Sequence, residues 1–334
     1  MSMGHGHASP PPSLKPEPTR DRIMNAKETN ELPASTAHPE AVRLPDFIVI
    51  GEMRCGSTTL WEMLDRHPAV AFPEEKELHF FDDRDGRWSR GVDWYADLFK
   101  HIAPDVSAGE ATPDYLFHEG ACERIAATVP GARLLVILRD PKERAWSHYW
   151  HNIRRGRETL GFDEAMKAEA GRMESPDVAV RSHFSYVTRG HYVRRLEHFA
   201  RVFGRDSLRV IFLEELIAEP ERCMREVCAH LGIDAVPEVL TRMPPQRNKA
   251  DYPRWPALSA LTRRMMKAVR TNPLLAGPAA AFAKATRPLR TYSGQTRMDP
   301  ETRARLAELY RGSDVELAAW LGREVPWAAK SPKH

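Results

Sequence analysis

The chain has 334 residues, of which 42% are hydrophobic and 28% charged, so it can bury the core of one large domain. Its formal charge of +3 is small for this length, which argues against a nucleic-acid-binding protein and against a polybasic membrane anchor. Four irregularly spaced cysteines exclude a secreted disulfide framework and a zinc-ribbon pattern, and they favour a reducing compartment.

The N-terminus has no apolar run behind a basic start, and no stretch of about 18 apolar residues occurs. We therefore expect no transmembrane segment and a cytoplasmic location. Residues 1–43 are rich in Pro, Ser, Thr, Glu and His, and bury too little apolar area to offset ordering entropy, which predicts a disordered tail before a domain at 44–330.

The ordered domain begins with an unbroken apolar run at 47–50, which predicts a buried parallel strand. A polar loop follows. Leu60, Met63 and Leu64 then recur at helical spacing, and the helix is expected to end before Pro68. The unit is strand, loop, helix.

The same unit recurs later in the chain. A strand at 134–138 precedes a helix that begins at Pro141, and further helices and strands are expected at 192–203, 208–213 and 220–231. Alternating strands and helices predict an α/β fold, a P-loop-like parallel β-sheet flanked by helices.

The segment 255–291 mixes basic and apolar residues. We expect a helical C-terminal insertion or lid there. A helix lying on a membrane surface is the alternative, which Pro273 and Pro278 disfavour because they interrupt any long helix.

The first strand-to-helix loop has the composition and placement of an anion-binding turn. Gly51 and Gly56 keep the spacing of the nucleotide-triphosphate pattern GxxxxGK[ST], but Ser57 occupies the lysine position and Arg54 supplies the charge. The backbone N–H groups expected to face a ligand belong to Cys55, Gly56, Ser57, Thr58 and Thr59. A tight connection without a ligand is the alternative.

The second loop belongs to the motif RDPKERAWSHY. Arg139 follows a strand end and can contact a phosphate with two N–H groups, and Ser147 on the next helix can donate another hydrogen bond. A salt bridge from Arg139 to Asp140 or to a neighbouring carboxylate is the alternative.

Between these motifs lies KELHFF, which begins at Lys76. If the segment is extended, Glu77 and His79 share one face, suited to acid/base chemistry, and Leu78 and Phe80 share the other. A charged turn that runs into a buried aromatic pair explains the pattern equally well.

The order of these motifs resembles the sulfotransferases that use 3′-phosphoadenosine 5′-phosphosulfate (PAPS), especially the heparan sulfate N- and O-sulfotransferase branch and its bacterial relatives. The stretches that carry the resemblance are FIVIGEMRCGSTTLWEML, KELHFFDD, RGVDWY, EATPDYLF, LLVILRDPKERAWSHYWH and RGHYVRRLEHF, with a weaker echo in MDPETRARLAELY. Several spaced motifs in order are more specific than any one of them.

The resemblance implies a role for each matching residue. The loop from Arg54 to Thr59 would bind the 5′-phosphosulfate, Arg139 and Ser147 would bind the 3′-phosphate, and Glu77 would be the general base. His79 competes for the base role, although orienting work suits it better.

Two positions depart from the family pattern. Arg54 stands where the family has a lysine, and because arginine does not give up its proton, Lys76 could supply one instead. The basic loop that closes over the 3′-phosphate is represented here only by Gly294 and Arg297.

The implied reaction is in-line transfer of a sulfuryl group from PAPS to a hydroxyl or amine, without a metal ion. A glycan or glycosylated small molecule is the expected acceptor, and Thr112, Asp114 and Tyr115 could line its site or merely end a strand. Two rival functions stay open: a P-loop kinase, and a non-catalytic module that binds PAPS or its product. The oligomeric state also stays open, a homodimer included.

Overall fold

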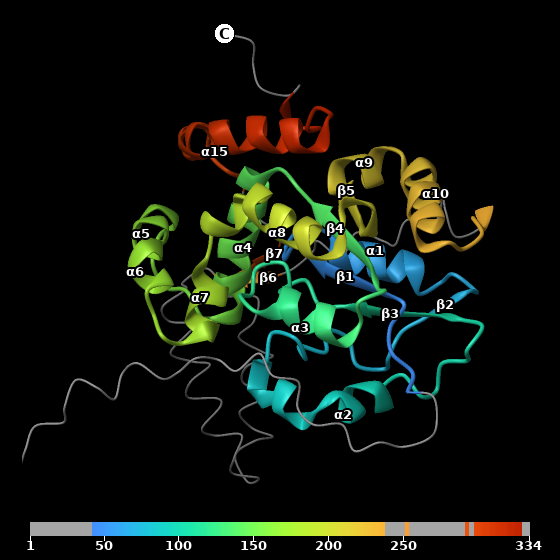
Figure 1. Cartoon of the computed structure of the whole chain (residues 1–334). Helices are drawn as coiled ribbons and strands as arrows, with labels where there is room; N and C mark the ends of the chain where they lie inside the picture. Colours follow the sequence, from blue (N-terminus) through green and yellow to red (C-terminus); the bar gives the residue numbers. More distant parts are fainter. Residues whose placement is uncertain (1–41, 238–250, 254–290, 294–296, 329–334) are drawn as a thin grey trace, which may run out of the picture. The chain divides into compact units, whose positions relative to one another are not determined.

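The computed structural model of the chain describes residues 42–237, 251–253, 291–293 and 297–328 (Figure 1). The tail expected at 1–43 lies outside the described residues up to residue 41. The helical insertion or lid expected at 255–291 lies outside them up to residue 290. The description below concerns the part that includes all the described residues.

Five parallel strands form the main sheet, in the spatial order β2-β3-β1-β4-β5 (Figure 1). The strands are β1 (Phe47–Gly51), β2 (Val70–Ala71), β3 (Ser107–Ala111), β4 (Arg133–Leu138) and β5 (Leu208–Phe212). The expected α/β fold with a parallel sheet is confirmed. The two later strands lie within a residue of the predicted ranges.

Helices connect and cover these strands. They are α1 (Ser57–Leu64), α2 (Val92–Asp97), α3 (Ala121–Thr128), α4 (Pro141–Arg155), α5 (Phe162–Lys167), α6 (Glu169–Met173), α7 (Val178–Phe184), α8 (Val193–Phe203), α9 (Leu213–Ala218), α10 (Pro220–Leu231) and α15 (Pro300–Leu321). Single 3₁₀ turns occur at Arg84–Gly86, Trp88–Arg90, Thr188–Gly190 and Arg205–Ser207.

The central strands are buried on both faces, which explains their unbroken apolar runs. Successive side chains of a strand point to opposite faces. Ile48 and Leu134 therefore pack in one core cluster with α3 and α8, whereas Phe47 and Leu135 pack in another with α1 and α10. The two clusters hold β1 and β4 between these two sets of helices.

The strand order reverses direction at β1. From β1 the chain goes to the edge strand β2, comes back to β3 beside β1, and then crosses to the other side of β1 with β4 and β5. In open α/β sheets, ligands bind at the carboxyl ends of the strands where this reversal occurs. The loops that follow β1 and β4 are therefore the expected place for a ligand.

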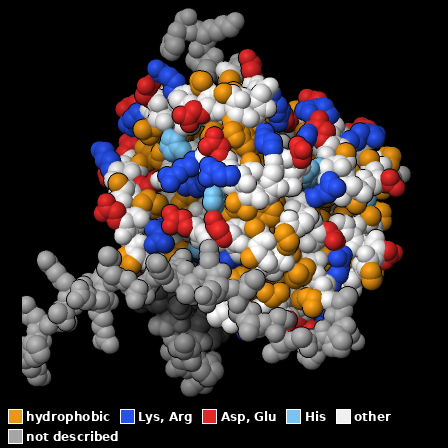
Figure 2. All heavy atoms as spheres, viewed as in Figure 1, with side chains coloured by type: hydrophobic (Ala, Val, Ile, Leu, Met, Phe, Trp, Pro, Cys, Tyr) orange, Lys and Arg blue, Asp and Glu red, His pale blue; other side chains and the backbone are white. Residues whose placement is uncertain are grey.

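Two smaller features complete the described chain. Strands β6 (Asp251–Pro253) and β7 (Thr291–Ser293) form an antiparallel pair, and β6 runs beside α4. Among the described residues no helix is both long and apolar enough to cross a bilayer. Figure 2 shows basic, acidic and hydrophobic side chains interspersed on the visible face, without a large area of one charge.

Candidate active site

The loop between β1 and α1 is shaped around Gly56. Its φ is 98°, and a Cβ at this position would lie 2.6 Å from Cδ1 of Leu213, so only glycine fits both the backbone and the space. Gly56 caps α1, and the first N–H groups of a helix have no partner within it. The N–H groups of Ser57, Thr58 and Thr59 therefore lie in the first turn of α1, the position at which helices can bind anions.

Arg54 links this loop to α4. Its Nε and Nη2 lie 3.2 Å and 3.0 Å from the hydroxyl oxygen of Ser147, and its Nη1 lies 3.5 Å from Nδ1 of His151. Burial, and then the charge of Arg54, lower the pKa of His151 to about 3, so His151 is a neutral acceptor near neutral pH. The structure therefore brings together two residues from separate predicted motifs.

Cys55 lies next to Arg54 but points inward. Burial, and then the carboxylate of Glu52, raise the pKa of its thiol to about 12, so the thiol stays protonated. Its backbone N–H, which the sequence predicts to face a ligand, instead donates to the carbonyl oxygen of Glu52 at 3.2 Å.

Arg139 directly follows β4. Its Nη2 lies 3.5 Å from Oε2 of Glu143, one turn into α4, and Glu143 also pairs with Arg303 at 2.5 Å. The ion pair with a neighbouring carboxylate, one of the two sequence interpretations, is present. Because it is long and partly exposed, it contributes little stability, and an anionic ligand can compete for the same guanidinium.

Helix α4 starts where it does for local reasons. The side chain of Asp140 accepts the N–H of Lys142 at 2.9 Å, and Pro141 occupies the first turn. The helix then places Ser147 two turns further on, almost fully buried beside Arg54.

The KELHFF segment lies against the first loop. Nζ of Lys76 donates to Oγ1 of Thr58 at 2.8 Å and sits 5.1 Å from the centre of the Trp61 ring. Lys76 and Glu77 are consecutive, so the KELHFF segment borders the loop between β1 and α1.

The segment is not an extended strand, although the prediction that Glu77 and His79 share one face assumed an extended backbone. Glu77 and His79 adopt φ values of 60° and 49°. Their side chains nevertheless approach each other, with Oε2 of Glu77 3.8 Å from Nε2 of His79, while Leu78 and Phe80 are buried in the core. Left-handed backbone at two alternate residues achieves this pairing.

His79 is bonded at both ring nitrogens. Nδ1 lies 2.7 Å from Oδ2 of Asp82, and Nη1 of Arg84 donates to Nε2 at 2.6 Å. Both ring nitrogens are thus engaged by protein side chains, which leaves none to take the proton of a substrate hydroxyl or amine. The side chain of Glu77 is 42% exposed, so its carboxylate is accessible to a substrate.

A buried ionic network was not found by sequence reasoning. Arg189, fully buried in the RGHY motif, donates to Glu52 at 2.6 Å and to Asp114. Although burial alone would raise it, the charges of Arg189 and Arg84 hold the pKa of the Asp114 carboxyl well below its usual range. The stretches RGHYVRRLEHF and EATPDYLF contain Arg189 and Asp114, but nothing in their local sequence indicates an internal ion pair.

The three residues expected near the acceptor have different surroundings. Thr112 and Tyr115 are buried and donate to Oε1 of Glu110, at 2.9 Å and 2.5 Å. They therefore belong to the protein interior. Asp114 instead contacts Arg84 at 2.7 Å, on the side of His79 and Glu77.

His79, Asp82 and Asp114 are close enough to be considered as metal ligands within the described chain. Arg84 already donates to His79 and to Asp114. A divalent cation in the same space would be repelled by the guanidinium, so the cluster does not fit a metal ion.

Positive charge gathers at the end of α4. The pKa of Arg157 is lowered by burial and by nearby Arg155 and Arg84, and the pKa of His183 falls to about 4 because of burial and then Arg157. Since Arg84 also contacts His79, this basic group borders the Glu77 side of the site.

The remaining predicted residues are near the C-terminus. Gly294 lies outside the described residues. Arg297 is exposed, three residues before α15 begins at Pro300.

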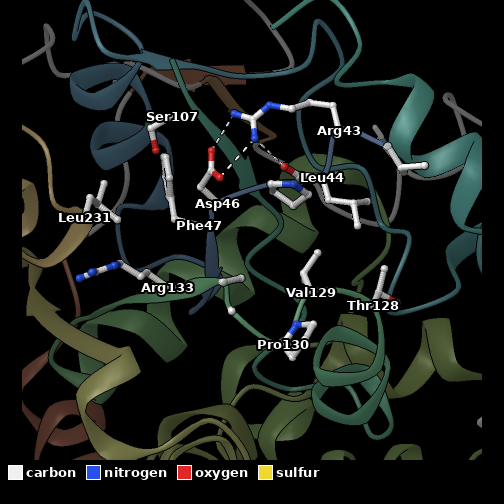
Figure 3. Close-up of a pocket in the computed structure, with 14 residues that line it drawn as sticks. Arg43, Leu44, Asp46, Phe47, Ser107, Thr128, Val129, Pro130, Arg133 and Leu231 are labelled. Carbon is white, nitrogen blue, oxygen red and sulfur yellow. Dashed lines mark hydrogen bonds and ion pairs between the residues drawn. The ribbon is translucent and has the colours of Figure 1, made fainter. Parts of the chain in front are cut away.

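A cavity of about 520 Å³ lies at the opposite end of the sheet. Figure 3 shows the residues that line it. Phe47, Ser107 and Arg133, which begin or border β1, β3 and β4, line it. Its basic side chains are engaged, because Arg43 donates to Asp46 and to the carbonyl oxygen of Val106. This cavity is therefore separate from the loops at the carboxyl ends.

Comparison with known proteins gives consistent results. A family model described as "Sulfotransferase domain" matches residues 44–251. The crystal structure of a sulfotransferase from Alicyclobacillus acidocaldarius resembles the chain with a TM-score of 0.61 and 25% identity, covering 85% of this chain and 98% of that one.

Two curated relatives are similar in sequence. The bifunctional heparan sulfate N-deacetylase/N-sulfotransferase 4 of Mus musculus is 30% identical over 84% of this chain and 30% of its own length. The heparan sulfate glucosamine 3-O-sulfotransferase 5 of Homo sapiens is 31% identical over 55% of this chain and 52% of its own length. The chain thus spans only about a third to a half of these relatives.

Proposed function

Because the chain belongs to the sulfotransferase family, we propose that it transfers a sulfuryl group from PAPS to a hydroxyl or amine of a glycan acceptor. The observation that carries this proposal is the contact of Arg54 with Ser147 across 93 residues of sequence, at the strand ends where α/β folds bind ligands. Arg139 follows the neighbouring strand.

The residues present suit the two phosphate groups of the donor. The loop N–H groups from Gly56 to Thr59 and the guanidinium of Arg54 would bind the 5′-phosphosulfate. Arg139 and Ser147 would bind the 3′-phosphate, which ordinary adenine nucleotides lack. At the start of α1, Gly56 lets this loop pack closely against Leu213, where a larger residue would not fit.

PAPS supplies the sulfuryl group and a bisphosphate leaving group, on which negative charge grows during transfer. Arg54 would neutralise that charge without giving up a proton. Lys76, whose ammonium donates to Thr58 of the loop at 2.8 Å, would give a proton to the departing phosphate. These groups supply the required positive charge, so the proposed step needs no metal ion.

Glu77 would act as the general base. Its carboxylate is partly exposed beside the loop and next to His79, whose ring is oriented by Asp82 and Arg84. In the proposed step the acceptor oxygen or nitrogen attacks sulfur, its proton passes to Glu77, and the bond from sulfur to the bridging phosphate oxygen breaks. His79 would orient Glu77 or the acceptor.

The basic residues on the Glu77 side favour an anionic acceptor. Arg84, Arg155 and Arg157 lie close enough to shift one another's pKa or that of His183, so a carboxylate or sulfate on the acceptor would relieve their repulsion. Both curated relatives above carry heparan sulfate in their names. A uronate-containing glycan is the acceptor class that we propose.

The test is sulfur transfer from radiolabelled PAPS to heparosan-type and neutral glycans. We expect turnover with the acidic glycan, and a fall in kcat of roughly 10² to 10⁴ for Glu77→Gln, with donor binding retained. Glu74→Gln, an exposed carboxylate three residues earlier, is the matched control and should be unaffected. Donor binding without turnover on any acceptor would favour the non-catalytic module instead.

A further inference from the structure

Arg189 joins carboxylates from two separate segments in the protein interior. Nη1 donates to Oε1 of Glu52 at 2.6 Å, and Nη2 donates to Asp114. Nε donates to Ser185 at 3.0 Å, and the guanidinium carbon lies 4.1 Å from the centre of the Phe117 ring. These contacts fix the orientation of a planar group that has no exposed surface.

At one end of this network, Glu52 contacts the first residues of the loop between β1 and α1. Glu52 follows β1 directly, and its Oε1 also accepts the N–H of Met53 at 2.8 Å. Its backbone carbonyl accepts the N–H of Cys55 at 3.2 Å. A buried carboxylate beside an anion site would repel the ligand, and Arg189 neutralises that charge.

The Asp114 end leads to the base segment. Oδ2 of Asp114 accepts from Nη2 of Arg84 at 2.7 Å, and Nη1 of the same guanidinium donates to His79 at 2.6 Å. His79 in turn lies 3.8 Å from Glu77. A series of ionic and hydrogen-bonded contacts therefore connects the donor loop to His79, which lies beside Glu77, with Arg189 at its centre.

We infer that Arg189 is a positioning residue that holds the donor loop and the Glu77 segment in the relative geometry required for in-line transfer. The inference rests on the proposed function. In-line displacement is sensitive to small displacements of the reacting groups, and a shift of about 1 Å can cost roughly 10²-fold in rate. A rigid fork between the two segments would prevent such a shift.

A double-mutant cycle tests the inference. Glu52→Gln and Asp114→Asn each remove one charge and keep the side-chain shape, and both residues contact Arg189. We expect each change to lower kcat about 10- to 100-fold, and the double variant to lose much less than the product of the two, because either change already frees the fork. The affinity for 3′,5′-bisphosphoadenosine should change by less than about threefold in Asp114→Asn.

Arg189→Lys provides the direct comparison. Lysine keeps the charge but cannot contact both carboxylates as a planar fork, so kcat should fall about 10-fold or more at saturating donor and acceptor. Arg172→Lys is the matched control, since Arg172 pairs with the buried carboxylate of Glu158 among the outer helices. It should lower thermal stability without changing kcat.

The outcomes separate the inference from the proposed function. If Arg189→Lys does not fold, the cycle decides. Multiplicative effects of Glu52→Gln and Asp114→Asn on kcat, or an unchanged kcat in Arg189→Lys, would overturn the positioning role while the wild type stays active. An inactive wild type that also fails to bind the bisphosphate would reject the proposed function, and the inference with it.

Discussion

The guanidinium of Arg54 donates to the hydroxyl oxygen of Ser147 from both Nε and Nη2, at 3.2 Å and 3.0 Å. The contact joins the loop after β1 to the second turn of α4, the helix that follows β4. In the sequence the two residues belong to separate motifs with separate implied phosphates. Their contact directly connects the regions proposed to bind the 5′ and 3′ ends of the donor.

Substitution of Arg54 tests whether charge alone matters there. We expect Arg54→Met to lower kcat by roughly 10² to 10³, because the leaving phosphate loses a fixed positive charge, and Arg54→Lys to stay within about 10-fold of the wild type. Steady-state kinetics with saturating PAPS measure this. Arg201→Met, an exposed arginine on α8, is the control. Equal losses in the Met and Lys variants would show that the fork on Ser147, and not the charge, is what the reaction requires.

Substitution of Glu143 distinguishes the two interpretations of Arg139. Glu143 lies 3.5 Å from the Arg139 guanidinium and competes with a ligand for it. If Arg139 binds the 3′-phosphate, Glu143→Gln should tighten binding of 3′,5′-bisphosphoadenosine by about 2- to 5-fold, in keeping with the small energy of exposed ion pairs. Titration calorimetry at low salt checks this. An unchanged or weaker affinity would mean that the Arg139–Glu143 pair is only structural.

Gly56 offers a test of the loop itself. Gly56→Ala would strain a backbone with φ of 98° and place a methyl group 2.6 Å from Leu213, so we expect a loss of roughly 1 to 3 kcal/mol in the free energy of unfolding and much weaker donor binding. Leu213→Ala should restore only part of this, because the strained φ remains. In Gly171→Ala the added Cβ meets no atom within 4 Å, so that variant should bind donor normally.

Glu110 predicts a pH dependence of stability. Burial raises the pKa of its carboxyl to about 7, against the lowering effect of its hydrogen bonds from Tyr115, Tyr95 and Thr112. The folded protein therefore holds this proton more tightly than the unfolded chain. Its favourable contribution is complete below the unfolded pKa and is lost as pH rises through about 7.

Glu110→Gln keeps a neutral side chain at every pH. The free energy of unfolding of this variant minus that of the wild type should therefore rise from about pH 5 to about pH 8. The rise should be on the order of 1 to 3 kcal/mol, since each pKa unit corresponds to about 1.4 kcal/mol. Denaturant unfolding at both pH values measures the difference. The same pH dependence in both proteins would contradict the assignment of this proton to Glu110.

The sequence was informative where a residue's role depends on its neighbours in the chain. Apolar runs at 47–50 and 134–138 predicted the two central strands, and Pro141 predicted where the helix after the second of them begins. The Glu77 and His79 pairing was anticipated, but through an extended segment, whereas positive φ at both residues produces it. Periodicity carries no information about such backbone.

The buried network around Arg189 was not predictable in the same way. Arg189 is 137 residues from Glu52 and 75 residues from Asp114 in the sequence. Nothing in their local sequence distinguishes an internal ion pair from surface charge. The same limit applies to Arg54 and His151. Contacts of this kind follow from the strand order, which places the ends of β1 and β4 side by side.

The most direct test of PAPS-dependent transfer is calorimetric titration with 3′,5′-bisphosphoadenosine, repeated with ATP and with the Arg139→Ala variant. We expect the bisphosphate to bind tightly to the wild type, ATP to bind far more weakly, and Arg139→Ala to lose about 10- to 100-fold in bisphosphate affinity, as removal of a charged hydrogen bond typically does. A preference for ATP, or no binding of the bisphosphate, would contradict the proposed donor.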